Sequence, residues 1–169
     1  KAVLIVGGGR TFFAGADITE FGKPLKEPGL PGLCTRIEAS PLPVISALHG
    51  TALGGGLEVA LGTHYRIAVP SAKVGLPEVL LGILPGAGGT QRLPRVIGAE
   101  KAIEIITTGR QVGMKEALAL GIVDEVVEGD VEQVGLDYAK RILAEGKGPR
   151  PVGQLPRPEP VDFDAAYDA

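Results

Sequence analysis

Cysteine, surplus positive charge and long apolar segments are scarce or missing in this 169-residue chain. The single cysteine, Cys34, cannot form an internal disulfide, so we expect a small buried side chain in a reducing compartment. The net charge is −3 with both signs interspersed, which makes nucleic acid and anionic membranes unexpected partners. No apolar segment reaches the roughly 20 residues that span a bilayer, and no signal peptide is evident. These absences favour a cytoplasmic protein, or an organelle-matrix protein whose targeting region is absent.

The residues that are present suit one globular domain with a sizeable core, since 44% are hydrophobic and 22% are charged. The chain begins at Lys1 with a buried-strand pattern already at residues 2–6, so we expect it to be cut from something longer. Proline and glycine become frequent after residue 145. We therefore predict a core over residues 1–145 and an arm or linker over residues 146–169, in which residues 162–167 begin a further helix.

Strand-like and helix-like segments alternate along the core, which predicts an α/β fold. The predicted strands are β-branched or apolar runs bounded by Gly, Pro or charge, at residues 2–6, 44–48, 65–69, 73–76 and 123–127. The predicted helices show apolar spacing of three to four residues, at residues 33–39, 55–61, 90–96, 99–107, 115–120 and 131–144.

Three consecutive glycines, Gly54 to Gly56, stand at the start of one predicted helix, with Glu58 one turn further in. Glycine lets a substrate oxygen approach the backbone closely, and the first amides of a helix lack internal partners. Glu58 follows Gly54 by four residues and so lies on the same helix face. The pattern indicates an anion site beside an acid/base group, although a glycine-packed helix entry with a solvated Glu fits it equally.

A second carboxylate, Glu78, stands alone in an apolar run that includes Leu76, Val79 and Leu80. Apolar surroundings remove water from a carboxyl group and raise its pKa toward the range useful for proton transfer. The alternative is a structural Glu that accepts hydrogen bonds from free amides at a helix start after Pro77.

Four motifs in this order resemble the crotonase superfamily of enoyl-CoA hydratases and isomerases: Ala-Gly-Ala-Asp-Ile at 14–18, Ala-Leu-Gly-Gly-Gly-Leu-Glu at 52–58, Leu-Pro-Glu at 76–78 and Pro-Gly-Ala-Gly-Gly-Thr-Gln-Arg-Leu at 85–93. The resemblance covers residues 1 to about 145. It implies a ββα spiral truncated at both ends. Further stretches at 20–24, 47–50 and 64–68 look like the hydratase region of multifunctional fatty-acid oxidation enzymes.

The resemblance also implies a reaction, the addition of water to a 2-enoyl-CoA thioester. The backbone amides of Ala16 and Gly55 would form the oxyanion hole that stabilises the enolate. Glu58 and Glu78 would flank one water, one carboxylate taking its proton while the other group supplies a proton at C2. The other implied substrate-binding and CoA-binding positions are Ala14, Gly15, Asp17, Ile18, Gly54, Pro77 and Gly86. CoA is part of the substrate, so no separate cofactor and no metal are expected.

Several other residues have a simpler explanation. Residues 3–9 run from a strand into glycines, but Phe12 stands where a dinucleotide-binding fingerprint needs its third glycine. Asp17 is better explained as a helix N-cap than as a catalytic group. His49 and His64 have no ligand-spaced partners and are expected to be structural. Arg10, Lys23 and Lys26 lie near the implied CoA loop, where contact with its phosphates and simple solvation are equally consistent.

Two functions remain open from the sequence. The first is an enoyl-CoA hydratase of fatty-acid β-oxidation, with 3-enoyl to 2-enoyl isomerisation as a further candidate activity; the presence of both glutamates favours hydration. The second is a non-catalytic crotonase-fold fragment of a larger protein that also contains a 3-hydroxyacyl-CoA dehydrogenase. The resemblance implies either a homotrimer or a place within a larger multifunctional chain.

Overall fold

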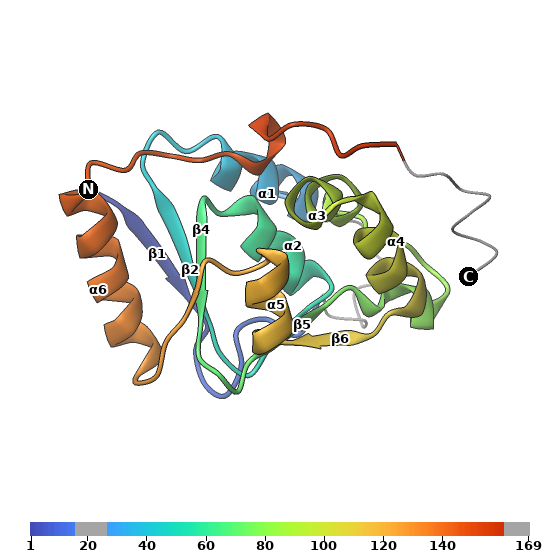
Figure 1. Cartoon of the computed structure of the whole chain (residues 1–169), viewed down its shortest axis with the longest axis horizontal. Helices are drawn as coiled ribbons and strands as arrows, with labels where there is room; N and C mark the ends of the chain where they lie inside the picture. Colours follow the sequence, from blue (N-terminus) through green and yellow to red (C-terminus); the bar gives the residue numbers. More distant parts are fainter. Residues whose placement is uncertain (16–26, 161–169) are drawn as a thin grey trace.

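Successive turns of strand, strand and helix organise the chain (Figure 1). The structure is a computed structural model that describes residues 1–15 and 27–160. The elements of the first three turns are β1 (Val3–Val6), α1 (Leu30–Glu38), β2 (Val44–Leu48), β3 (Thr51–Leu53), α2 (Gly55–Gly62), β4 (Tyr65–Ala68), β5 (Lys73–Gly75), the 3-10 helix η2 (Pro77–Leu81) and α3 (Gly89–Ile97). The remaining elements are α4 (Ala99–Thr108), β6 (Gln111–Gly113), α5 (Met114–Leu120), β7 (Glu125–Val126), α6 (Val131–Ala144) and the 3-10 helix η3 (Val152–Gln154).

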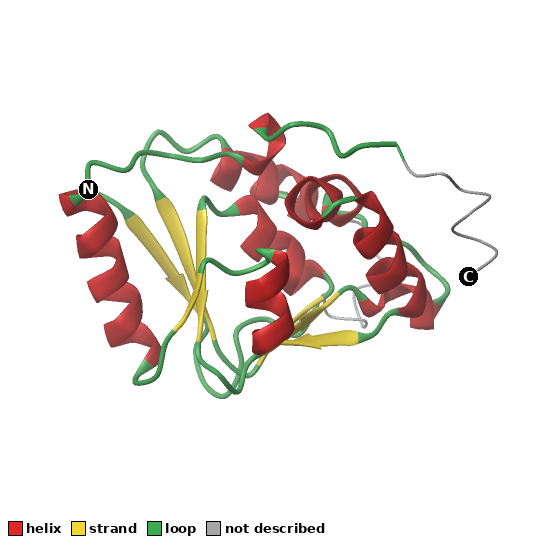
Figure 2. Cartoon of the chain, in the orientation of Figure 1, coloured by secondary structure: helices red, strands yellow, loops and turns green. Residues whose placement is uncertain are grey.

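Two sheets share the strands of these turns, with helices packed around both (Figure 2). The larger sheet is parallel throughout and has the order β1-β2-β4-β7. In the smaller sheet β3 pairs with β5 in parallel and β5 pairs with β6 in antiparallel fashion. Phe13 adds a single parallel bridge to Ala52, so the first turn also reaches the smaller sheet. Each turn thus places one strand, or a one-residue stub of a strand, in each sheet.

Helix α2 lies at the centre of the molecule and is buried from Gly56 to its end (Figure 1). Leu57 and Leu61 are fully buried in the main apolar cluster, where a side chain of this size contributes about 1.5–3 kcal/mol. Glu58 is the one ionisable residue of this helix and is only 2% exposed. A carboxylate in such a position must be compensated by nearby donors.

The α/β prediction is confirmed, with differences in the short elements. Strands β3 and β6, each of three residues, were not predicted because a run that short carries little alternation of apolar and polar residues. Helix α1 begins at Leu30 rather than at residue 33, with Pro31 in its first turn, where proline is well tolerated. The predicted strand at 123–127 pairs only over Glu125 and Val126.

The segment after α6 runs back across the top of the molecule over α1 and α3 (Figure 1). The Tyr65 hydroxyl donates to the carbonyl of Gly148 at 2.8 Å, and Val152 is 2% exposed. The Gly153 amide donates to Glu38 Oε1 at 2.6 Å. This part of the arm is packed against the core. Over residues 1–15 and 27–160, no helix is long and apolar enough to cross a membrane.

Candidate active site

The strands of three successive strand–strand–helix turns end at the same edge of the smaller sheet. Phe13, β3 and β5 are parallel neighbours there, joined by hydrogen bonds from Leu53 N to Phe13 O at 3.1 Å and from Gly54 N to Gly75 O at 2.9 Å. The residues that follow them are Ala14 and Gly15, Gly54 and Gly55, and the start of η2 with Glu78. Motifs that are about 20 to 40 residues apart therefore meet because parallel neighbours end at the same edge.

Glu58 reaches out of α2 into a loop of glycines. Its Oε1 accepts hydrogen bonds from the amides of Ala87 at 2.7 Å and Gly89 at 2.8 Å. A Cβ on Gly89 would lie 3.1 Å from that oxygen and 3.0 Å from the Pro85 Cβ, so glycine makes the close approach possible. The Glu58 carboxylate is buried, compensated and fixed in direction.

Glu78 is held differently, on the short helix η2 beside Gly54. A Cβ on Gly54 would lie 3.3 Å from Glu78 Oε1 and 3.9 Å from Oε2. Oε2 is shielded from solvent and has no hydrogen-bond partner within the described part of the chain. A buried oxygen in this state is costly unless it serves a ligand or a reaction. The alternative role, in which the carboxyl group accepts helix-start amides, is not filled by Oε2, although the carboxyl group does accept a hydrogen bond from the Glu78 backbone.

Burial is the main cause that raises the pKa of Glu78, and the negative charge of Glu58 raises it further, against a hydrogen bond from the Glu78 backbone. The predicted direction of the shift is confirmed. Desolvation, the predicted cause, is confirmed as the largest one, although Leu80 is 70% exposed and is the least buried of the three predicted neighbours.

The raised pKa of Glu78 predicts an effect of pH on stability. Native Glu78 binds its proton more tightly than unfolded Glu78, so its stabilising contribution is present at acid pH and is lost as pH rises through the folded pKa. Glu78→Gln should therefore raise the melting temperature at neutral pH by a few degrees, since 1 kcal/mol corresponds to about 2–4 °C in a domain of this size. The gain should shrink as pH falls below the raised pKa of folded Glu78 and should be largely gone below 4.5, the ordinary pKa of Glu. Thermal unfolding followed from acid to neutral pH measures both; a gain that grows toward acid pH would contradict the assignment.

The start of α2 forms the other side of the site. Gly54 caps the helix with φ +54°, a left-handed conformation that favours glycine, and Gly55 is the first helical residue. A Cβ on Gly56 would lie 2.0 Å from Phe13 O, so the chain leading to Ala14 and Gly15 passes directly over the helix start. Ala14 and Gly15 are exposed there. The predicted residues Ala16, Asp17 and Ile18 lie outside the described residues, as do Lys23 and Lys26.

Two further predicted positions flank Glu78 and the glycine loop. Pro77 is in the first turn of η2, where its fixed φ starts the helix and sets the direction of Glu78. Gly86 is exposed, and a Cβ on it would meet nothing within 4 Å. Its backbone thus borders open space beside Ala87, the residue that donates to Glu58.

The sequence did not reveal the donors that hold Glu58, nor the charged pair behind them. The Ala87 and Gly89 amides were not predicted because a backbone donor leaves no residue-type signal. Arg92 is 8% exposed and pairs with Glu38 at 2.8 Å. The one signal in the sequence for this charged pair was Arg92 itself, which follows the glycine-rich residues 86–89.

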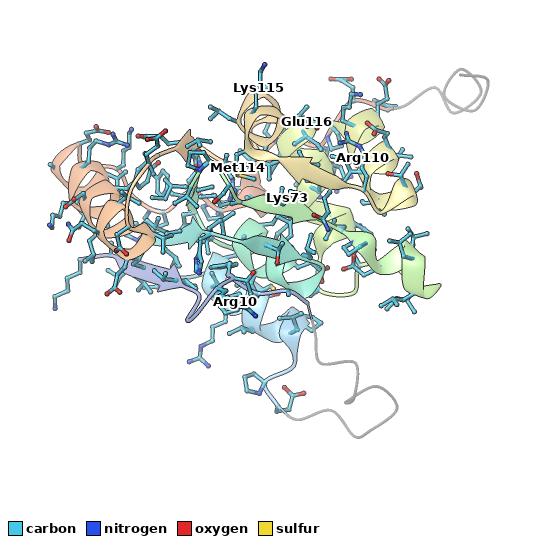
Figure 3. The ribbon with its side chains drawn as sticks, turned by 90° about the horizontal axis from the view of Figure 1, so that it is seen from below. Arg10, Lys73, Arg110, Met114, Lys115 and Glu116 are labelled. Carbon is cyan, nitrogen blue, oxygen red and sulfur yellow. The ribbon has the colours of Figure 1, made fainter. Side chains whose placement is uncertain are left out.

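The remaining candidates are structural or exposed. Cys34 is fully buried, as predicted, and burial raises the pKa of its thiol to about 11. His64 Nδ1 accepts from Val44 N at 2.9 Å and its Nε2 lies 3.0 Å from Glu38 O, so it is structural as predicted. Arg10, the candidate near the implied CoA loop, is exposed. Arg110, which was not a candidate, contacts Glu116 on another part of the molecule (Figure 3).

Comparison with known proteins identifies the family. The model of the enoyl-CoA hydratase/isomerase family matches residues 1–148. The chain belongs to this family. The expected crotonase-type fold is confirmed by solved structures of enoyl-CoA hydratases.

Among the relatives of this chain, the peroxisomal bifunctional enzyme of Danio rerio is 50% identical over 168 residues, which is 99% of this chain and 23% of the relative. A probable enoyl-CoA hydratase of Bacillus subtilis is 46% identical and is covered over 63% of its length; the match takes in 92% of this chain. The crystal structure of enoyl-CoA hydratase from Bacillus anthracis superposes with a TM-score of 0.76 at 41% identity, covering 85% of this chain and 59% of that chain. The chain thus spans less than two thirds of each.

Proposed function

We propose that this chain carries the centre that hydrates 2-enoyl-CoA thioesters in fatty-acid oxidation. The observation that supports it best is the pair of glutamates at one edge of the smaller sheet. Glu58 is fixed by two amides, while Glu78 keeps an unpartnered buried oxygen and a raised pKa. Two carboxylates in different environments suit a reaction that needs both a proton acceptor and a proton source.

The proposed reaction begins with the thioester oxygen bound by backbone amides. Gly55 supplies one amide from the first turn of α2, and by family resemblance Ala16 supplies the other. As water oxygen attacks C3, one carboxylate takes a proton from the water and charge moves onto the thioester oxygen as an enolate. The enolate then collapses and a proton from the other carboxylic acid reaches C2. One hydrogen of the water stays in the new hydroxyl group and the other is left on the first carboxyl group, so a proton must return from the first carboxyl group to the second before the next turnover.

Two finer assignments belong to the same proposal. Isomerisation of 3-enoyl-CoA to 2-enoyl-CoA needs one base that removes and returns a proton, and we assign this role to Glu78. Exposed Arg10 is a candidate contact for CoA phosphates. The names of several relatives say peroxisomal, so the predicted cytoplasmic location stays a prediction.

A hydration assay on crotonyl-CoA, followed as loss of enoyl-thioester absorbance, tests the proposal. It compares this chain with a version extended to the length of its hydratase relatives. Turnover by the 169-residue chain supports a complete centre. Turnover by the extended version alone supports the alternative of a fragment that needs its flanks, and turnover by neither contradicts the hydratase assignment.

Gly55→Pro tests the oxyanion hole, because proline removes the amide donor while fitting the first position of a helix. In an active protein we expect turnover to fall by about 10²–10³-fold, as for loss of one oxyanion donor elsewhere. Ala99→Pro, the same change at the first residue of α4, is the matched control and should leave turnover near the original value. Unchanged turnover in a folded Gly55→Pro protein would rule out the assignment.

A further inference from the structure

Arg92 is a buried cation whose contacts lead to the loop that holds Glu58. Its Nη1 donates to the Ala87 carbonyl at 2.9 Å, and the Ala87 amide in turn donates to Glu58 Oε1 at 2.7 Å. Its Nε and Nη2 donate to Glu38 Oε2 at 3.2 and 2.8 Å. One guanidinium therefore connects α1 to the residue whose backbone fixes the carboxylate.

The glycine loop is shaped around this guanidinium. Gly88 has φ +102°, and a Cβ on it would lie 2.2 Å from Arg92 Nη1. Gly89, next in the chain, leaves the space that the Glu58 carboxylate occupies. Two consecutive glycines thus serve two different neighbours, and neither place would accept a larger side chain without moving its partner.

The far end of the ion pair is anchored as firmly. Glu38 Oε1 accepts the Gly153 amide at 2.6 Å, and the Glu38 carbonyl lies 3.0 Å from His64 Nε2. Both carboxylate oxygens of Glu38 therefore accept hydrogen bonds, Oε1 from Gly153 and Oε2 from Arg92. The ion pair is largely shielded from water, with side-chain exposures of 10% for Arg92 and 16% for Glu38. Salt screening of such a pair is weak, so its geometry persists under ordinary buffer conditions.

We propose that Arg92, braced by Glu38, is the positioning residue for Glu58. It fixes the loop so that the Ala87 and Gly89 amides aim at the carboxylate, and it does not itself touch the substrate. Lysine cannot replace it, because a single ammonium lacks the planar fork that reaches the Ala87 carbonyl and the Glu38 carboxylate together. This inference rests on the proposed role of Glu58 in hydration.

The first test needs no activity. Hydrogen exchange of the Ala87 and Gly89 amides, measured by NMR, should accelerate about 10- to 100-fold in Arg92→Lys, because the loop loses its carbonyl anchor. Arg95→Lys, on the same helix and with no hydrogen bond to the loop among the described residues, is the matched control and should exchange at the original rate. Unchanged exchange in Arg92→Lys would overturn the positioning role whatever the protein catalyses.

The second test is a double-mutant cycle in the form of the protein that is active toward crotonyl-CoA. Arg92→Lys should lower kcat about 10- to 100-fold with little change in KM, as expected for a displaced catalytic group. In the Glu58→Gln background the same change should cost almost nothing, because the positioned group is already lost. Equal losses in both backgrounds would show a general structural effect and overturn the inference.

Glu38→Gln covers the case in which Arg92→Lys fails to fold, since it keeps an acceptor for Arg92 and removes only the charge. We expect the same changes in exchange and kcat, smaller in size. Absence of hydration in the unsubstituted protein would count against the proposed function, while the exchange result would still decide whether Arg92 fixes the loop.

Discussion

Glu58→Gln should lower hydration of a 2-enoyl-CoA by about 10²–10⁴-fold, the usual range for a lost acid/base group, and should spare isomerisation of 3-enoyl-CoA more. The substitution preserves shape, and the Gln oxygen can still accept the Ala87 and Gly89 amides that Glu58 accepts now. The expected loss therefore reports proton transfer and not a collapsed loop. The two rates are measured on the same preparation of active protein.

Glu100→Gln on the exposed side of α4 is the matched control, since it removes one carboxylate outside the site and should change neither rate. Equal damage to hydration and isomerisation by Glu58→Gln would mean that this carboxylate serves both reactions, which contradicts the proposed division of roles.

Glu78→Gln should damage both reactions, with hydration again reduced by about 10²–10⁴-fold. Glu78 has the unpartnered oxygen and the raised pKa, and both support its proposed role in exchanging a proton with carbon. The same substitution is expected to stabilise the fold at neutral pH, because an amide beside Gly54 carries no charge to desolvate. Lower activity together with a higher melting temperature would identify a group kept for chemistry at a cost in stability.

The comparison of the two glutamate variants decides the roles. If Glu58→Gln abolishes isomerisation while Glu78→Gln leaves it intact, the assignment is reversed. If both variants keep full hydration in folded protein, neither carboxylate transfers the proton.

The carboxylates and the glycines at the start of α2 could be predicted from the sequence because residue type carries their chemistry. A carboxylate in an apolar run and glycines at a helix start are visible without coordinates, and the direction of the Glu78 pKa shift followed from the first of these. The cause did not follow in full, since exposure of Leu80 depends on how η2 packs.

The support of the site could not be predicted in the same way. The Ala87 and Gly89 donors are backbone groups, and the partner of Arg92 lies 54 residues earlier on another helix. Which turns stack, and in what register, is set by tertiary packing, which also creates the three-residue strands β3 and β6 that local pattern missed.

The meeting of three turns at one edge of the smaller sheet also bears on how the protein acquires its site during folding. Phe13, Gly54 and Glu78 are distant in sequence, so loop-closure entropy opposes their contact until the intervening strands pair. An intermediate with only two of these turns in place would lack either the chain at Phe13, the helix start at Gly54 or the carboxylate of Glu78. The last of these strands to pair therefore completes the proposed site, so the site forms late in folding and together with the register of the smaller sheet.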